Sequence, residues 1–411
     1  MDGWRLVAAV AGAVLAAPPA GAAASPSRPA YLPCPVVKPA TPVPARPSPS
    51  PRDPGAPVLG GDGLATAGLT VPPGAPPPPA NLSATSWLVA DLDSGAVLAA
   101  CGPHEQSPPA SVQKLLLAET LLPKLDPAQV IEVVPADLDI ERGSSAVGLL
   151  VGGHYAVDTL WYGLLLESGN DAANTLARVG GGSGGVPATL DAMNAEARRL
   201  GALDTHAATP SGLDGPGQFT SAYDLALIAR ADLARDDFRK YDTALRAQIP
   251  AQPPKDPRGF QIQNENRLLY NYPGALGGKT GYTDRARHTY VGAAARNGRR
   301  LVVTLLDAEA VPVPGWRQGA ELLDWGFGLP LDASVGHLVS PDEAERLRHA
   351  PVPGSAPGPV PAAALARPAR ESTPMMVAGF GALVALLALP LVMIVGRSRR
   401  QPVRRTRIPL K

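Results

Sequence analysis

The sequence has few cysteines and few lysines, and its net charge is close to zero. Its 411 residues include two cysteines, and seven lysines beside thirty arginines. Because it contains no C-x-x-C string, Cys/His cluster or phosphate-binding glycine loop, we expect no metal site and no cofactor. A net charge of +1 likewise gives no reason to expect a nucleic-acid partner.

The two cysteines, Cys34 and Cys101, are a candidate pair for one disulfide. Such a bond persists where the compartment is oxidising. It would close a loop of roughly 66 residues and stabilise the fold by about 4 kcal/mol in the chain-entropy account. Two free thiols remain the alternative at this point.

Proline and glycine, by contrast, are abundant and concentrate towards the two ends. The 48 prolines and 43 glycines are too many for a chain that is packed throughout. Residues 25–81 and 331–374 are rich in Pro, Ala and Gly, and we expect such sequence to stay extended without a core. The folded body is therefore expected at residues 82–330.

The ends of the chain carry targeting patterns. An apolar stretch too short to cross a bilayer, followed by Ala22-Ala23-Ala24, predicts a signal peptide at residues 1–24. Residues 375–396 are uncharged, apolar and long enough to span a bilayer. The basic tail at residues 397–411 follows directly, and the positive-inside rule places it in the cytoplasm with the body outside. We therefore expect a single-pass cell-membrane protein that contacts the lipid bilayer through this helix.

The body has strand patterns at both ends and helix patterns between them. Strands are predicted at residues 87–90, 96–99, 278–282, 289–296 and 300–306, with a hairpin turn at Asn297-Gly298. Helices are predicted at residues 111–122, 159–167, 171–179, 189–200, 222–233 and 316–325. This order favours an α+β fold, in which one sheet is built from both ends and a helical region is inserted.

Three short motifs occur in order along the body: Ser111-Val112-Gln113-Lys114, Ser168-Gly169-Asn170 and Lys279-Thr280-Gly281. Each is weak alone, but two of the few lysines fall within them. Ser111 is near a predicted helix start, where free N–H groups favour negative charge, and Lys114 lies one turn further on. An amine there can take the serine proton if burial and nearby cations lower its pKa from about 10.4.

The other two motifs suit contacts with a substrate. Ser168 and Asn170 lie in the break between two predicted helices, where side chains can point into a cleft. Lys279 and Thr280 lie on a predicted strand, and Gly281 allows another backbone to approach closely. A peptide could add alongside that strand.

The three motifs together resemble those of the penicillin-binding and serine β-lactamase superfamily. The surrounding sequence is similar to the low-mass D-alanyl-D-alanine carboxypeptidases of peptidase family S11 over residues 84–328. The stretches that carry this similarity are Pro109-Ala110-Ser111, Tyr162 to Asn174, Ser211 to Gly217 and Gly278 to Asp284. The resemblance implies a β-lactamase/transpeptidase-like fold, with an antiparallel sheet flanked by helices, an inserted all-helical subdomain and a peptidase domain at residues 82–330.

The resemblance also implies an activity and a role for each motif residue. The enzyme would remove the terminal D-Ala from peptidoglycan stem peptides, and β-lactam antibiotics would inhibit it. The residues that would perform the chemistry are Ser111 as nucleophile, Lys114 as base and Ser168 as proton relay. The residues that would hold the substrate are Asn170, Lys279, Thr280, Gly281 and Tyr282. The backbone N–H groups of Ser111 and Tyr282 would form the oxyanion hole.

The sequence departs from the family after the third motif. Relatives often have Ala-Gly there, whereas this chain has Ala286 followed by Arg287 and His288. Arg285 and Arg287 are therefore either carboxylate-binding side chains or solvated arginines on a loop. Two other functions stay open, a class A-like serine β-lactamase and a non-catalytic wall-binding protein on the same fold. The β-lactamase needs a glutamate in an E-x-x-L-N pattern, and no such string occurs between the second and third motifs.

Overall fold

The computed structural model describes residues 31–37 and 58–349. Within these residues, no helix combines the length and the apolar character that crossing a membrane requires. The expected signal peptide at residues 1–24, the expected span at 375–396 and the basic tail at 397–411 all lie outside the described residues.

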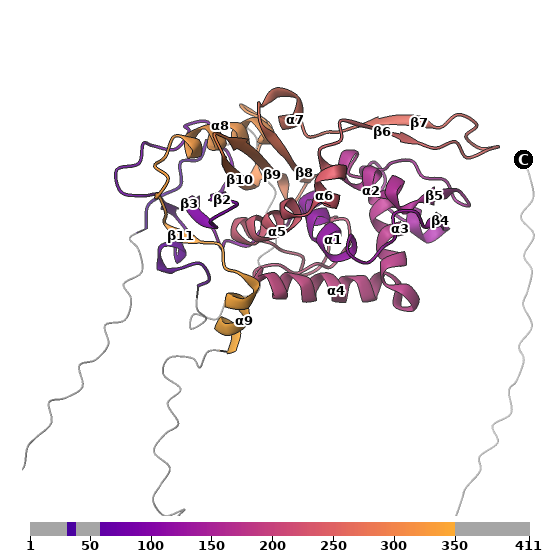
Figure 1. Cartoon of the computed structure of the whole chain (residues 1–411), viewed down its shortest axis with the longest axis horizontal. Helices are drawn as coiled ribbons and strands as arrows, with labels where there is room; N and C mark the ends of the chain where they lie inside the picture. Colours follow the sequence, from indigo (N-terminus) through magenta and orange to yellow (C-terminus); the bar gives the residue numbers. More distant parts are fainter. Residues whose placement is uncertain (1–30, 38–57, 350–411) are drawn as a thin grey trace, which may run out of the picture. The chain divides into compact units, whose positions relative to one another are not determined.

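The described chain contains a seven-stranded antiparallel sheet in the order β1-β3-β2-β10-β9-β8, with β11 also paired to β3. Figure 1 shows this sheet, with β1 unlabelled, beside the helical region. The main strands are β2 (Ser86–Asp91), β3 (Ala96–Cys101), β8 (Ala275–Thr283), β9 (Arg287–Arg296) and β10 (Arg299–Ala308). Asn297 and Gly298, between β9 and β10, have φ values of 52° and 79°, as a tight hairpin turn requires. The prediction of one sheet built from both ends of the body is confirmed.

The side chains of the sheet alternate between two cores. On β2, Leu88 and Ala90 join one core and Trp87 and Val89 join the other, as the two-residue repeat of a strand requires. Helix α5 (Ala222–Ala234) packs on the first core and α8 (Gly315–Phe327) on the second. Helices therefore cover both faces of the sheet (Figure 1).

The region inserted between β3 and β8 is mainly helical. Besides α5 it contains α1 (Lys114–Leu121), α2 (Val157–Leu166), α3 (Asn170–Gly180), α4 (Gly185–Leu200), α6 (Asp236–Asp242) and α7 (Leu268–Asn271). The expectation of an all-helical insertion is wrong, because two small two-stranded antiparallel sheets also occur: β4 (Val130–Glu132) with β5 (His154–Ala156), and β6 (Arg246–Ile249) with β7 (Phe260–Gln263). Strands this short carry too few alternating residues for the sequence to distinguish them from loops.

Parts of the two proline-rich segments also pack on the sheet, whereas we expected both segments to stay extended. The strands β1 (Leu69–Thr70) and β11 (Gly336–His337) both pair with β3, and α9 (Pro341–His349) follows β11. Leu59, and Leu64 at the end of the 3-10 turn Asp62–Leu64, are buried in the first core. Strands of two residues can form even in a proline-rich segment, because two consecutive residues other than proline are enough. Composition alone therefore did not reveal β1 and β11.

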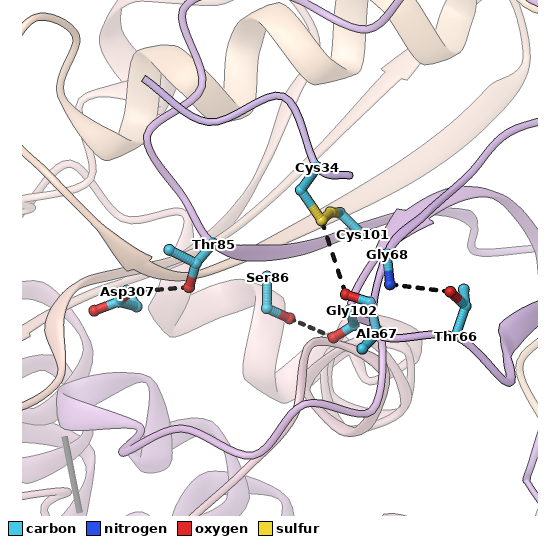
Figure 2. The surroundings of a disulfide bond; sticks show 9 residues. All are labelled: Cys34, Thr66, Ala67, Gly68, Thr85, Ser86, Cys101, Gly102 and Asp307. Carbon is cyan, nitrogen blue, oxygen red and sulfur yellow. Dashed lines mark hydrogen bonds between the residues drawn. A yellow bond between two sulfur atoms is a disulfide. The ribbon is translucent and has the colours of Figure 1, made fainter. Parts of the chain in front are cut away.

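A disulfide joins Cys34 to Cys101, the last residue of β3, with the two Cα atoms 5.8 Å apart (Figure 2). Two backbone hydrogen bonds also hold the segment that carries Cys34. Leu69 N–H donates to Leu32 O at 2.7 Å, and Val37 N–H donates to Leu82 O at 2.8 Å. Composition left open whether the two cysteines form one disulfide or remain free thiols, and in this structure they form the disulfide.

Candidate active site

Ser111 and Lys114 are aligned at the start of α1. Ser111 lies in a 3-10 turn (Ala110–Gln113), and Lys114 is the first residue of α1. Because a 3-10 turn has three residues per turn, side chains at positions i and i+3 eclipse each other. Lys114 Nζ consequently lies 2.8 Å from Ser111 Oγ. The structure differs from the expected continuous helix only in this turn, which aligns the two groups.

Lys114 is completely buried and contacts three oxygens. Besides Ser111 Oγ, these are Asn170 Oδ1 and Ser211 O, both 2.7 Å from Nζ. None of the three belongs to a carboxylate. Burial, and then the positive charge of Lys279, lowers the pKa of Lys114 well below its usual range. The surroundings therefore favour a neutral amine beside the serine hydroxyl.

The second motif forms a tight turn between α2 and α3. Ser168 has a left-handed φ of 59°, which is uncommon for a residue with a side chain. There is no room for a side chain at position 169, because a Cβ on Gly169 would lie 2.4 Å from Val147 Cγ2. Ser168 Oγ is buried and, within residues 31–37 and 58–349, has no hydrogen-bond partner. The turn thus holds an unpaired hydroxyl in a strained conformation of the kind that gathers at functional sites.

The third motif lies on β8, the edge strand of the sheet. Lys279 is 1% exposed, and burial lowers its pKa to about 8, while the charges of Glu265 and Asp242 act in the opposite direction. Gly281 approaches the nucleophile, since a Cβ there would lie 2.8 Å from Ser111 N. Among the described residues, β8 has a neighbouring strand on one side only, so its other side can receive an extended peptide.

The three motifs meet at one cavity of about 710 Å³. Six of the predicted site residues line it: Ser111, Ser168, Asn170, Thr280, Gly281 and Tyr282. Lys114 and Lys279 are buried and are not part of the lining. The loop at residues 141–145 forms another part of the wall, and Asp171 fixes the segment that follows it by accepting hydrogen bonds from the Val147, Gly148 and Leu149 N–H groups.

The structure separates the two arginines whose roles the sequence left open. Arg285 lines the cavity. Arg287 does not, because its guanidinium donates to both oxygens of Glu309 at 2.9 Å and to Tyr282 Oη at 3.2 Å. Arg287 is therefore a support for Tyr282, neither a free carboxylate binder nor a solvated side chain.

Two acidic residues near the motifs were missed by the sequence analysis. Glu265 lines the cavity, and its charge raises the pKa of both Lys114 and Lys279. Asp242 is buried and accepts a hydrogen bond from Gly278 N–H at 2.6 Å. Neither lies in a recognisable pattern, since Glu265 is in a short stretch between β7 and α7 and Asp242 ends a seven-residue helix.

The arrangement can perform acyl transfer. A serine hydroxyl contacts a buried amine whose lowered pKa suits a general base, and a second buried amine lies on the edge strand beside the serine. The fold and the site therefore define a serine hydrolase that acts through an acyl-enzyme.

Comparison with known proteins gives the family. A family profile described as D-alanyl-D-alanine carboxypeptidase, peptidase family S11, matches residues 73–310. The D-alanyl-D-alanine carboxypeptidase DacB2 of Mycobacterium tuberculosis is 48% identical over 264 residues, which cover 62% of this chain and 86% of that protein. DacD of Escherichia coli is 32% identical over 261 residues, covering 61% of this chain and 64% of the relative. The chain belongs to the D-alanyl-D-alanine carboxypeptidase family of serine peptidases.

Solved structures agree with this assignment. The crystal structure of a D-alanyl-D-alanine carboxypeptidase from Mycobacterium tuberculosis aligns with a TM-score of 0.61 and 46% identity, over 66% of this chain and 100% of that one. The Streptomyces K15 DD-transpeptidase aligns with a TM-score of 0.59 and 26% identity, over 62% of this chain and 100% of that one. The expected penicillin-binding type of α+β fold is thus confirmed for the sheet and its helices.

Proposed function

We infer that this enzyme removes the terminal D-Ala from peptidoglycan stem peptides, through an acyl-enzyme on Ser111. The observation that carries this is the triple contact of Lys114 Nζ with Ser111 Oγ, Asn170 Oδ1 and Ser211 O. A neutral amine has two N–H groups and one lone pair. Asn170 Oδ1 and Ser211 O can only accept, so they take the two N–H groups, and the lone pair is left for the Ser111 proton.

Acylation then proceeds from this arrangement. Lys114 takes the proton from Ser111 Oγ as this oxygen attacks the carbonyl carbon of the penultimate D-Ala. The negative charge that develops on the carbonyl oxygen is held by the backbone N–H groups of Ser111 and Tyr282. The peptide C–N bond breaks, and the leaving amine of the terminal D-Ala takes up a proton through Lys114 and the unpaired hydroxyl of Ser168. Water hydrolyses the ester and frees Ser111.

The other motif residues bind the carboxyl-terminal end of the substrate peptide. Lys279 carries a buried positive charge beside the cavity, and Thr280 offers a hydroxyl in the lining. Together they suit the free carboxylate of a terminal D-Ala, or the carboxylate of a β-lactam. The Asn170 side chain is fixed by Lys114, so it can also hold the substrate amide.

Mass spectrometry of a stem pentapeptide tests the function. Wild-type protein should release one terminal D-Ala, and Ser111→Ala should release none. A fluorescent penicillin should label the wild type but not Ser111→Ala. Absence of any label would favour the non-catalytic wall-binding protein, and rapid turnover of the penicillin would favour the β-lactamase.

We also propose that the catalytic body is extracytoplasmic and anchored by residues 375–396, after removal of residues 1–24. The apolar stretches and the basic tail support this placement. The Cys34–Cys101 bond also suits an oxidising compartment. Protease treatment of intact cells should digest the body while a tag after residue 411 remains protected. Removal of residues 375–411 should release the active protein into the medium, and retention in the cytoplasm would contradict the proposal.

A further inference from the structure

A buried carboxylate contacts the backbone directly before Lys279 and is not used in the mechanism above. Asp242 is the last residue of α6 and is 0% exposed. Its Oδ2 accepts a hydrogen bond from Gly278 N–H at 2.6 Å. Its Oδ1 has no hydrogen-bond partner in the part of the chain that the structure describes. One oxygen of this carboxylate therefore binds the strand, and the other is buried without a donor.

The strand β8 is shaped to admit this carboxylate. Gly277 and Gly278 have φ values of 119° and 132°, and the pairing of β8 with β9 shifts register between Ala275 and Gly277. A Cβ at Gly277 would lie 2.0 Å from Asp242 Oδ2. A Cβ at Gly278 would lie 2.1 Å from Val291 O. Only glycine fits both positions, and the resulting bulge sets the direction in which β8 enters the third motif.

The charges around Asp242 point to Lys279 as its electrostatic partner. Within the described parts of the chain, three titratable groups interact with this carboxylate: Lys279 on β8, Asp232 on α5 and Tyr290 on β9. Lys279 is the cation among them. Burial raises the pKa of Asp242 to about 7 and lowers the pKa of Lys279 to about 8. The attraction between the two charges opposes both shifts, so each group favours the charged form of the other.

We propose that Asp242 is a positioning residue for Lys279, which holds the glycine bulge of β8 in place and supplies a buried negative charge that keeps Lys279 cationic. This inference rests on the proposed function, in which the Lys279 cation attracts the substrate carboxylate. The two parts of the role are separable, because a neutral amide oxygen can accept the Gly278 N–H but cannot stabilise the charge on Lys279.

The Asp242→Asn variant of the full chain separates the structural role of Asp242 on β8 from its electrostatic role towards Lys279. The rate of Ser111 acylation by a fluorescent penicillin, and kcat and KM for the pentapeptide, are measured from about pH 6 to about pH 9.5. The alkaline limb reports loss of the Lys279 proton and should move about half a unit to one unit lower in Asp242→Asn. Near pH 8 the KM should rise more than kcat falls, because the carboxylate is bound less well.

Two further variants serve as controls. Asp242→Glu keeps the charge, so its alkaline limb should stay at the wild-type position even where the longer side chain lowers the rate. Asp236→Asn removes an acid from the same helix that is 95% exposed, and its profile should match the wild type.

The outcomes are distinct. If the Asp242→Asn profile is lower than that of the wild type at every pH but not displaced, Asp242 acts on structure alone and the proposal is overturned. The same holds if Asp242→Glu shifts as far as Asp242→Asn does. Wild-type protein that is not acylated at any pH would instead reject the proposed function itself.

Discussion

Lys114 and Lys279 are both buried lysines, but their surroundings affect the pKa of each side chain differently. Both side chains are buried, at 0% and 1% exposure. Lys114 contacts three uncharged oxygens, and the charge of Lys279 lowers its pKa further. Glu265 raises the pKa of both lysines; Asp171 adds to this effect on Lys114, and Asp242 adds to it on Lys279, whose pKa burial lowers to about 8. Burial lowers both pKa values, and the charge of Lys279 lowers that of Lys114 further, which suits the proposed roles of Lys114 as the base and Lys279 as the cation.

Arginine at each lysine is the strongest test of this comparison. A guanidinium does not deprotonate between about pH 6 and about pH 9.5. Lys114→Arg should therefore lose the base and lower the acylation rate by about 10³–10⁴. Lys279→Arg keeps the charge and should lose no more than about 10² through altered positioning. Stopped-flow acylation by a fluorescent penicillin measures both, and equal losses would remove the distinction between the two lysines.

Gly281, where the strand of Lys279 meets the turn of Ser111, gives the next largest effect. A Cβ there would lie 2.8 Å from Ser111 N and 2.4 Å from Thr289 Oγ1, so alanine would disturb an oxyanion donor. If Ser111 N–H is an oxyanion donor as proposed, Gly281→Ala should lower acylation by about 10²–10³ without moving either limb of the pH profile. Gly315→Ala is the control, since its Cβ would make an ordinary contact at 3.5 Å. Wild-type acylation by Gly281→Ala would exclude this close approach from catalysis.

Glu265 affects both lysines and should give a smaller change. Its charge raises the pKa of both lysines. For Lys279 it is the largest influence after burial, whereas for Lys114 it follows both burial and the charge of Lys279. Glu265→Gln should shift both limbs of the profile of kcat/KM to lower pH, the alkaline limb further, because each lysine then loses its proton more easily. Glu321→Gln, on α8, should leave the profile unchanged. A shift to higher pH would contradict the assignment.

Asp232 shows the effect of burial on a carboxylate that accepts no hydrogen bond within the described residues. It is 0% exposed, and neither of its carboxylate oxygens has a hydrogen-bond partner among the described residues. Burial, and then the charge of Glu119, raises its pKa well above the usual value. The folded state thus keeps a proton that the unfolded state releases, so this contribution to stability is present at acid pH and is lost as the pH rises through the folded pKa.

The Asp232→Asn side chain cannot ionise, so the free energy of unfolding of this variant should fall less than that of the wild type between about pH 5 and about pH 8. The difference between the two proteins should reach about 1 kcal/mol or more over this range. Urea unfolding at several pH values measures the difference. Parallel curves for variant and wild type would show that Asp232 is already ionised in the folded protein.

Much of the fold could be predicted from local patterns. The alternating strands around residues 87–90 and 300–306, and the Asn297-Gly298 turn, need only neighbouring residues, and all three are present. The short pairs β1 with β3 and β11 with β3 could not be predicted, because their partners lie far away in sequence and each contributes two residues. The role of Arg287 was undecidable for the same reason, since Glu309 lies 22 residues away.

The sequence by itself determined which side chains are available for the chemistry: a serine three residues before a lysine, a short polar turn and a strand that carries a second lysine. Local geometry decides such features, because one helical turn or one tight turn fixes them. Only the tertiary structure decided the charge of each lysine, because burial and the approach of Asn170, Glu265 and Asp242 depend on contacts between distant segments.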